Sequence, residues 1–361
     1  MAELIIETEK IRENILNLSK YFDEHNTQWS LITKVFSGEM DFLRQILTDD
    51  IIQNLNTVGD SRLTSLKNLR SVRPDLRTIY IKPPARVYAS DVVEYADISL
   101  NSSLGTLEAL DQAAQHKNKE HKVIIMIELG ELREGVNRSD IVDFFEQALR
   151  FKHIEIIGIG SNLGCMYGVE PTYDKLMQLK LYKELLENRF SISLPIVSGG
   201  SSITLPLIDQ GAVPPEINHF RIGEAAFFGL SPLDNQPFEN LHTHTFELAA
   251  NIIEIEEKKV LPDGHIGDAN VGHTANLDAA SKEDTSVKAI LDFGLIDVAQ
   301  EDIEPIDKSI TFVGITSDML VVDLGPAGEK KYQIGDQVRF APNYMAVARL
   351  LHSKFIDQVF V

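Results

Sequence analysis

The sequence predicts an α/β protein built as a (β/α)8 TIM barrel followed by a smaller C-terminal β domain. With 361 residues, the chain exceeds the usual size of a single hydrophobic core, so two domains are expected. From residue 30 to about residue 230, short runs rich in β-branched residues alternate with amphipathic helical stretches, a pattern typical of parallel βα units. Beyond Pro232, strands separated by turns replace this alternation.

Eight β-branched runs can be counted in the first part of the chain. They span residues 30–34, 55–59, 78–82, 97–101, 122–128, 154–158, 194–197 and 218–221. Helical stretches such as 104–117, 139–152 and 171–189 separate them, and a further helix over residues 8–22 precedes the first run. Eight strand–helix units are the number that a (β/α)8 barrel requires. We therefore assign residues 1–232 to the barrel domain.

The last third of the chain is typical of a β domain. Its predicted strands span residues 246–256, 286–293, 309–313, 319–324 and 337–340. The first long helical stretch in this part begins at Tyr344. We assign residues 240–361 to the second domain, with residues 231–240 as the linker.

Acidic residues outnumber basic ones by 54 to 34, which gives the chain a formal charge of −20. Such a charge repels phosphate backbones and anionic lipid headgroups, so we expect neither nucleic acid nor a membrane as a partner. Cys165 is the only cysteine, so no internal disulfide can form, as in proteins of a reducing compartment. The chain has no run of 18 apolar residues and no secretory signal pattern. We expect a soluble, cytoplasmic protein.

Polar residues follow the ends of all eight predicted barrel strands. In a (β/α)8 barrel the active site lies at the C-terminal ends of the strands, where the βα loops meet. The residues at these ends are Lys34, Asp60, Arg62, Lys82, Asn101, Arg133, Asn162, and residues 198–202 and 221–224. The sequence therefore predicts an active site among these side chains, and we expect no metal site.

Glycine-rich segments after the seventh and eighth strands lie where such barrels usually bind phosphate. The segment Ser-Gly-Gly-Ser-Ser offers Ser198, Gly200, Ser201 and Ser202, and Gly223 lets the neighbouring backbone approach the same anion. A plain glycine turn is the alternative for an isolated motif of this kind. Its place after the seventh strand favours the phosphate site.

Lys34 ends an otherwise apolar run and points its amine into the predicted barrel mouth. Burial and nearby arginines there favour the neutral amine, which can form a Schiff base. A lysine that only extends into solvent is the commoner alternative. Lys82 is followed by two prolines, which suggest a rigid loop, so we interpret it as structural.

Taken together, these segments resemble the alanine racemase family, the fold type III pyridoxal 5′-phosphate (PLP) enzymes, and most closely its ornithine and broad-specificity amino-acid racemase branch. The resemblance spans nearly the whole chain. The segments that carry it lie at residues 31–34, 127–135, 158–165, 197–202 and 221–224. It implies a PLP-dependent racemase that interconverts L- and D-amino acids by taking and returning the α-proton.

The resemblance also implies roles for single residues. Lys34 carries the cofactor as a Schiff base and serves as one of two bases. Arg221 faces the pyridine nitrogen; because an arginine cannot accept the ring proton, the cofactor is a poorer electron sink, which favours proton return over transamination. Asn162 supports Arg221, and Glu224 closes the phosphate loop.

Arg133 is implied to contact the phenolic oxygen of the cofactor or the substrate carboxylate. A structural salt bridge is the alternative, because Glu128, Glu131 and Glu134 are close in sequence. The resemblance further implies a homodimer in which the β domain of one subunit completes the barrel site of the other.

The chain departs from the alanine racemase pattern in the acid–base groups. Met126 stands where many alanine racemases have a modified lysine, and Gly267-Asp268 stands where the catalytic tyrosine is expected. The second base is therefore unassigned. For contact with the cofactor phosphate or the substrate, Tyr344 is a better candidate than Tyr332, which lies in a polar strand.

The substrate is less closely defined. Asp318 lies where the ornithine racemase branch has a similar polar motif, and its carboxylate could hold the distal ammonium of ornithine or lysine. Met319 departs from the histidine expected there. An alanine-like substrate stays open.

Three other functions fit part of the pattern. A decarboxylase of the same fold needs a cysteine in the β domain, whereas Cys165 lies in the barrel part. A non-catalytic PLP-binding homeostasis protein would lack the second domain. An aldolase that forms a Schiff base on an ordinary phosphate-binding barrel would bind the phosphate of its substrate.

Overall fold

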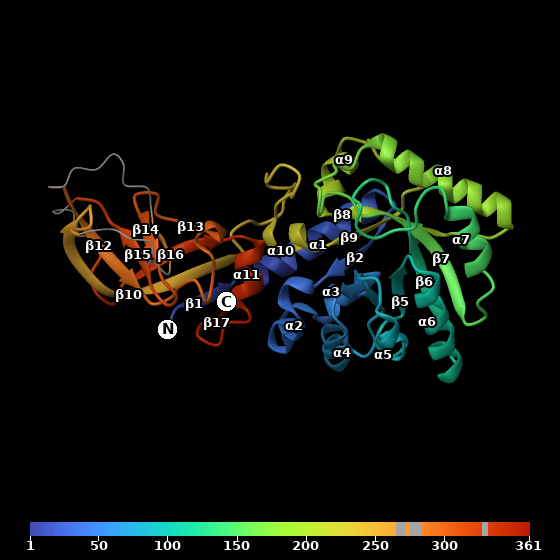
Figure 1. Ribbon diagram of the computed structural model, residues 1–361, viewed down its shortest axis with the longest axis horizontal. Coiled ribbons are helices and arrows are strands. Elements are labelled where there is room, and N and C mark those ends of the chain that lie inside the picture. Colours follow the sequence, from blue (N-terminus) through green and yellow to red (C-terminus); the bar gives the residue numbers. More distant parts are fainter. Residues whose placement is uncertain (265–271, 275–283, 327–330) are drawn as a thin grey trace. The chain divides into compact units, whose positions relative to one another are not determined.

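Eight parallel strands form a closed barrel in the order β2 to β9, so the predicted fold class is confirmed (Figure 1). The strands are β2 (Gln28–Ile32), β3 (Thr57–Asp60), β4 (Thr78–Tyr80), β5 (Ile98–Asn101), β6 (His121–Met126), β7 (Ile154–Gly160), β8 (Ile196–Ser201) and β9 (His219–Ile222). The last strand pairs with the first, with Gln28 opposite His219 and Leu31 opposite Ile222, which closes the ring. This computed structural model describes residues 1–264, 272–274, 284–326 and 331–361.

Helices surround the ring of strands (Figure 1). They are α1 (Thr8–Glu24), α2 (Met40–Ile46), α3 (Asp49–Gln53), α4 (Leu63–Val72), α5 (Ala89–Tyr95), α6 (Leu104–His116), α7 (Ile141–Ala148), α8 (Tyr173–Phe190), α9 (Leu205–Asp209) and α10 (Glu224–Phe228). The longest, α8, begins where the Thr172 side chain accepts the N–H of Lys175, and it ends at Ser191 in the left-handed conformation. No helix in the described part of the chain is long and apolar enough to cross a lipid bilayer.

The second unit is a mostly antiparallel sheet. Its strands are β1 (Glu3–Ile6), β10 (Phe246–Lys259), β11 (His273–Thr274), β12 (Thr285–Leu291), β13 (Ile303–Pro305), β14 (Thr311–Ile315), β15 (Leu320–Asp323), β16 (Gln337–Pro342) and β17 (Asp357–Phe360). The long strand β10 pairs with β1, β12 and β16. One helix, α11 (Tyr344–Leu350), follows β16.

The N-terminal strand β1 belongs to the C-terminal sheet. The chain divides into a unit of Glu9–Thr243 and a unit of Met1–Thr8 with His244–Val361, whereas the sequence pattern predicts a barrel domain of residues 1–232. β1 pairs with β10 and β17, and the Thr8 hydroxyl donates to the carbonyl of Val361 at 2.9 Å. The partners of β1 lie more than 200 residues away in sequence, so no local sequence pattern predicts the pairing.

Two strand ends also differ from the prediction, and both matter for the barrel mouth. Lys34 is not in β2 but opens the short 3₁₀ helix η1 (Lys34–Phe36), which Ser37 ends in the left-handed conformation. The segment predicted as a loop after the seventh strand continues β8 as far as Ser201, and the 3₁₀ helix η3 (Ser202–Thr204) follows.

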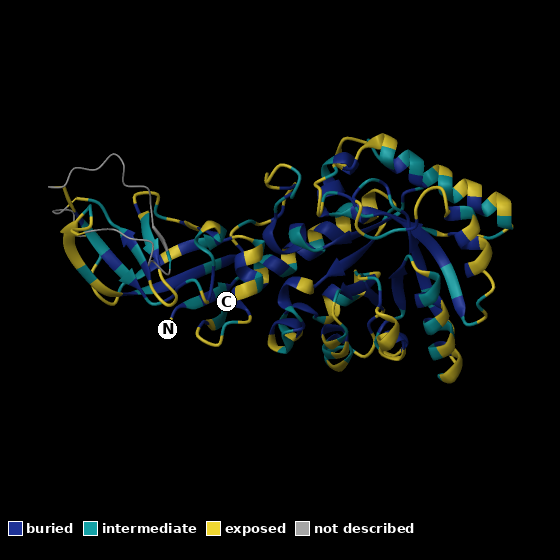
Figure 2. Ribbon diagram, in the orientation of Figure 1, coloured by how far each residue is buried: buried dark blue, intermediate teal, exposed yellow. Residues whose placement is uncertain are grey.

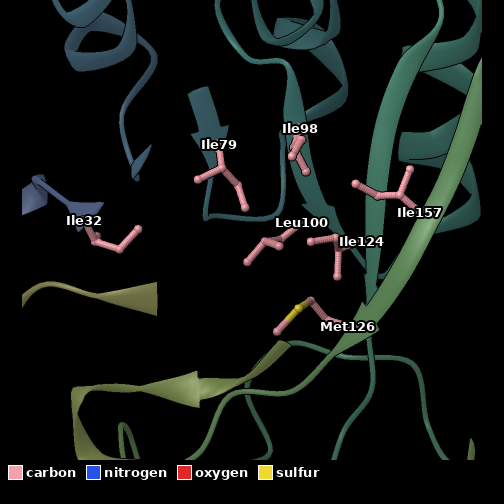
Figure 3. Close-up of a cluster of buried hydrophobic side chains, with 7 residues drawn as sticks. All are labelled: Ile32, Ile79, Ile98, Leu100, Ile124, Met126 and Ile157. Carbon is pink, nitrogen blue, oxygen red and sulfur yellow. The ribbon is translucent and has the colours of Figure 1, made fainter. Parts of the chain in front are cut away.

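Branched aliphatic side chains fill the barrel. Buried residues concentrate in its strands, and exposed residues lie on the outer helix faces (Figure 2). A cluster of side chains from β2, β4, β5, β6 and β7 meets inside the ring (Figure 3): Ile32, Ile79, Ile98, Leu100, Ile124, Met126 and Ile157. Gly59 on β3 leaves the space that this cluster needs, because a Cβ there would lie 2.7 Å from Cγ2 of Ile79 and 2.8 Å from Cδ1 of Ile32.

We predict that Ile124→Ala destabilises the barrel by about 2–5 kcal/mol, because the fully buried side chain leaves a cavity when it is truncated. Denaturant unfolding followed by tryptophan fluorescence measures the change, since Trp29 is buried in the same barrel. Val87→Ala, at a residue that is 83% exposed, is the control and should change the unfolding free energy by less than about 0.5 kcal/mol. Equal unfolding curves for the two variants would contradict the assignment of this cluster as the barrel core.

Candidate active site

Lys34 lies directly beyond the end of β2, held by its neighbour Thr33. Thr33 is buried, and its hydroxyl lies 3.3 Å from the carbonyl of Gly59 and 3.3 Å from Oδ2 of Asp60, both on β3. The backbone of Lys34 is therefore fixed to the neighbouring strand. The Lys34 residue itself is exposed, so the burial expected from the sequence is not present.

Asp60 is a fully buried carboxyl at the end of β3. Burial raises its pKa to about 6, although hydrogen bonds from the backbone N–H of Arg62 and the hydroxyl of Thr33 act in the opposite direction. This acid therefore titrates close to neutrality, next to the turn that carries Lys34.

Glu224 shares the mouth of the barrel with Lys34. Burial raises the pKa of Glu224, while the positive charge of Lys34 lowers it, so the two side chains lie within range of each other's charge. The backbone of Gly223, next to Glu224 in sequence, passes β2 closely, since a Cβ on Gly223 would lie 2.9 Å from the carbonyl oxygen of Ile32. The predicted phosphate loop and the predicted cofactor lysine thus meet at adjacent strand ends.

The ends of β8 and β9 are joined through Ser202. The Ser202 hydroxyl accepts the N–H of Ala225 in α10 at 3.2 Å. Gly200 has φ +142°, and a Cβ there would lie 2.4 Å from Oγ1 of Thr204. At Gly200 and at Gly223, the two glycines of the predicted phosphate site, the surrounding atoms therefore leave no room for a side chain. Ser201, next to Gly200, is half-buried.

The Ser198 side chain contacts β9 residues inside the barrel. Its hydroxyl accepts an N–H of the Arg221 guanidinium and lies 2.9 Å from Nδ1 of His219. Its side chain therefore belongs to the buried interior of the barrel. The sequence pattern instead predicts that this hydroxyl binds phosphate.

Arg221 is a buried cation with acceptors on several sides. One terminal nitrogen donates to Ser198, and the other donates to the carbonyl of Ser161 at 2.9 Å and to Oδ1 of Asn162 at 3.4 Å. Burial lowers the pKa of Arg221 to about 10, so the guanidinium stays charged near neutral pH. The structure thus brings Asn162 and Arg221 together.

Arg133 forms an ion pair with Glu134, which was the alternative to a role in ligand binding. Its guanidinium donates to both carboxylate oxygens of Glu134 and also contacts Sγ of Cys165. Charges of Glu134 and Arg133 act in opposite directions on the pKa of Arg221, so these groups lie near the same mouth. Arg133 is 37% exposed and can still turn toward a ligand.

Glu131 organises the loop after β7, a role that the sequence did not reveal. Its carboxylate is buried and accepts four backbone N–H groups, from Cys165, Met166, Tyr167 and Val169. Burial acts to raise the pKa of Glu131, but these donors together hold it below its ordinary value. Only the fold distinguishes this acid from its neighbours Glu128 and Glu134.

Two buried histidines inside the barrel are also absent from the predicted site. Nε2 of His219 lies 2.9 Å from the Ser30 hydroxyl, and Nε2 of His121 lies 2.8 Å from the Ser99 hydroxyl. A signal existed for His219, because residues two apart on a strand share a face and Arg221 was already placed in the site. In the described residues, no cluster of three or more His, Cys, Asp or Glu side chains could hold a metal ion.

Asp318, Tyr344, Tyr332 and Gly267-Asp268 are the predicted residues beyond the linker. Asp318 is exposed between β14 and β15, where its Oδ1 accepts the Ser317 hydroxyl at 3.0 Å. Tyr344 is half-buried at the start of α11. Both belong to the unit that contains the C-terminal sheet. Tyr332 donates to Asp307 at 2.8 Å, and Gly267-Asp268 lies outside the described residues.

The chain is similar to known proteins along its whole length. Residues 6–232 match the family described as alanine racemase, N-terminal domain. The chain is 32% identical to ornithine racemase of Acetoanaerobium sticklandii over 357 residues, covering 99% of this chain and 98% of that protein. It is 27% identical to lysine racemase of Thermotoga maritima over 358 residues, with coverage of 99% and 98%.

A solved structure shares the fold. Alanine racemase from Bartonella henselae with covalently bound pyridoxal phosphate superposes with a TM-score of 0.74 at 17% identity, covering 100% of this chain and 99% of that chain. At this identity, the likeness concerns the fold.

We predict that Glu131→Gln destabilises the protein by about 2–3 kcal/mol at pH 7, because an amide cannot accept all four N–H groups. The folded-state pKa of Glu131 is lowered, so its contribution is present above the ordinary glutamate pKa and is lost as the pH falls through the lowered value. The difference from the wild type should therefore shrink below about pH 4. Unfolding free energies at both pH values provide the measurement, with Glu170→Gln, at an exposed position beside the same loop, as control. A pH-independent difference would show that the carboxylate is not the anchor.

Proposed function

The chain belongs to the alanine racemase family and is an amino-acid racemase, and we propose that it works with PLP bound to Lys34 on an amino acid that carries a distal amino group. The observation that supports this proposal is that Lys34 directly follows β2, which pairs with β9, while Gly223 just beyond β9 closely approaches the β2 backbone and the charge of Lys34 acts on Glu224. PLP supplies an electron sink that stabilises negative charge at the α-carbon of a bound amino acid.

The residues present fit this cofactor. At Gly200 and Gly223 a side chain would collide with Thr204 and with the β2 backbone, so both positions keep the backbone clear of side-chain atoms, as a phosphate site requires. Ser201 and Ser202 add hydroxyl groups beside them. The buried Nδ2 of Asn162 has no protein partner among the described residues, which leaves a donor near Arg221 for a ligand.

Arg221 affects the reaction because its guanidinium does not donate a proton to the cofactor. Its guanidinium has only N–H donors and stays charged at neutral pH, so it can bind the pyridine nitrogen but does not transfer a proton to it. A ring that is not protonated delocalises negative charge less well. Prompt return of the proton to the α-carbon is then favoured over transamination, which suits a racemase.

Lys34 provides one of the two proton-transferring groups. We assign to its Nζ the removal or return of the α-proton on one face of the substrate, with Thr33 fixing the backbone from which the side chain extends. Arg133 is assigned to the substrate carboxylate or the phenolic oxygen, a role that requires it to exchange part of its contact with Glu134.

The C-terminal unit supplies the other assignments. We assign to Tyr344 a contact with the cofactor phosphate or the substrate, and to Asp318 the binding of a distal ammonium, since its exposed carboxylate suits ornithine or lysine. These assignments imply a homodimer in which this unit of one subunit completes the barrel mouth of the other. The cytoplasmic location inferred from the single cysteine stays a prediction.

Incubation of the PLP-loaded protein with L-ornithine, L-lysine and L-alanine in D₂O tests the function. We expect α-deuterium and the D-enantiomer with the carboxylate retained, fastest for the two basic amino acids. Release of carbon dioxide would support the decarboxylase instead. PLP binding without exchange for any of these substrates would support the homeostasis protein.

Lys34→Ala should lower racemisation by at least about 10³-fold, because it removes both the covalent attachment and one proton-transferring group. Borohydride reduction followed by peptide mapping should label Lys34 in the wild type. Lys82→Ala is the matched control, since Lys82 is also an exposed lysine beyond a strand end and should leave both results unchanged. Label on any other lysine would overturn the assignment.

A further inference from the structure

His219 lies in the barrel interior, two residues before Arg221 on β9 and on the same face of the strand. Both residues lie on β9 and are buried, at 4% and 5% exposure. Nδ1 of His219 lies 2.9 Å from the hydroxyl of Ser198 on β8, and Nε2 lies 2.9 Å from the hydroxyl of Ser30 on β2. The imidazole therefore bridges the two strands that flank its own.

The hydrogen bonds of Ser198 fix the direction of this bridge. Its oxygen accepts an N–H of Arg221, and a guanidinium cannot accept anything in return. In the described part of the chain, the other partner of the Ser198 hydroxyl is Nδ1 of His219. The Ser198 oxygen could also accept a second N–H, but its own hydrogen would then have no acceptor among these partners, whereas an unprotonated Nδ1 provides one.

A neutral imidazole with a bare Nδ1 carries its hydrogen on Nε2. That hydrogen goes to Ser30, whose own hydroxyl contacts Oγ1 of Thr57 on β3. A single chain of donors thus runs from Arg221 through Ser198, His219 and Ser30 to Thr57. Burial, reinforced by the charge of Arg221, lowers the pKa of His219 to about 3, which keeps the imidazole neutral.

This series of hydrogen bonds limits how the Arg221 guanidinium can turn. Of its five N–H donors, three are engaged in the described residues, with Ser198, Ser161 and Asn162. Two donors are left for a ligand. If Ser198 were free to rotate, one more donor would lose its acceptor and the guanidinium could tilt within the buried site.

We propose that His219 is a positioning residue that, as the neutral Nε2–H tautomer, orients Arg221 through Ser198 toward the pyridine nitrogen of the cofactor. This inference rests on the proposed function, because it assumes that Arg221 contacts that nitrogen. It assigns His219 no contact with substrate or cofactor. A shift of the guanidinium by about 1 Å is enough to weaken such a contact.

His121 provides a matched control within the same barrel. It is 2% exposed, lies on β6, and bonds through Nε2 to Ser99, which also accepts Nδ2 of Asn101. Burial lowers the pKa of His121 to about 4, so it too is a neutral buried imidazole. None of its recorded contacts among the described residues leads to Arg221.

Cofactor binding to the apoprotein separates positioning from general structural support. We compare the dissociation constants of PLP and of 1-deaza-pyridoxal phosphate, in which C–H replaces the pyridine nitrogen, for wild type, His219→Leu, Ser198→Ala and His121→Leu. His219→Leu and Ser198→Ala should weaken PLP binding about 5- to 30-fold, since one charge-assisted contact is lost. Binding of the deaza analogue should change by less than about twofold, and His121→Leu should not distinguish the two ligands.

His219→Gln keeps one acceptor and one donor and should restore most of the preference for PLP. It also serves as the test variant if His219→Leu does not fold. Equal weakening of both ligands in the His219 and Ser198 variants would overturn the proposal, because a merely structural role acts on both alike. A wild type that binds neither ligand would instead refute the proposed function.

The tautomer can be tested without any cofactor. ¹⁵N NMR of apoprotein labelled at histidine, with the His219→Gln spectrum as the assignment control, should show an unprotonated Nδ1 and a protonated Nε2 for His219 at neutral pH. The opposite tautomer would overturn the direction of the donor chain.

Discussion

A charged guanidinium buried at the end of β9 is the constraint on which the barrel mouth depends. Arg221 is 5% exposed, and a buried charge is tolerated only where acceptors surround it. These acceptors come from Ser198 within β8 and from Ser161 and Asn162 just beyond β7. The register that places Gly160 of β7 opposite Ser198 of β8 brings them together, and the glycines that follow Ser198 in β8 take their position from the same register. Because β9 also pairs with β2, the turn that carries Lys34 is tied to this arrangement.

Local sequence patterns carry most of the barrel. The β-branched runs and the helices between them repeat, so counting them identifies the (β/α)8 fold and the end of the barrel that holds polar residues. The same patterns miss the strand ends, since hydrogen bonding decides where a strand stops. Gly200 can adopt φ +142°, so β8 continues through a segment whose composition suggests a turn. Lys34 leaves β2 because a 3₁₀ turn begins there.

Contacts between distant segments have no local signature. His219 finds its partners on β2 and β8, and a lone histidine in a strand gives no indication of either. Glu131 is one of several acidic residues in its segment, and only the folded loop shows which of them receives the amides. Residues that follow strand ends can therefore be named as site candidates from the sequence, whereas the sequence places His219 only on the same face as Arg221 and does not identify the partners of His219 or Glu131.

The pairing of β1 has a consequence for synthesis of the protein. Glu3 lies opposite Ala249 on one side and Asp357 on the other, while the whole barrel is encoded between β1 and β10. During synthesis β1 therefore emerges before the barrel, whereas its neighbours β10 and β17 emerge after it. Leu4 and Ile6, both fully buried in the finished sheet, stay without that cover while the barrel closes. The nascent chain therefore carries an unpaired β1 while the barrel is synthesised, the kind of strand edge that is prone to wrong pairing.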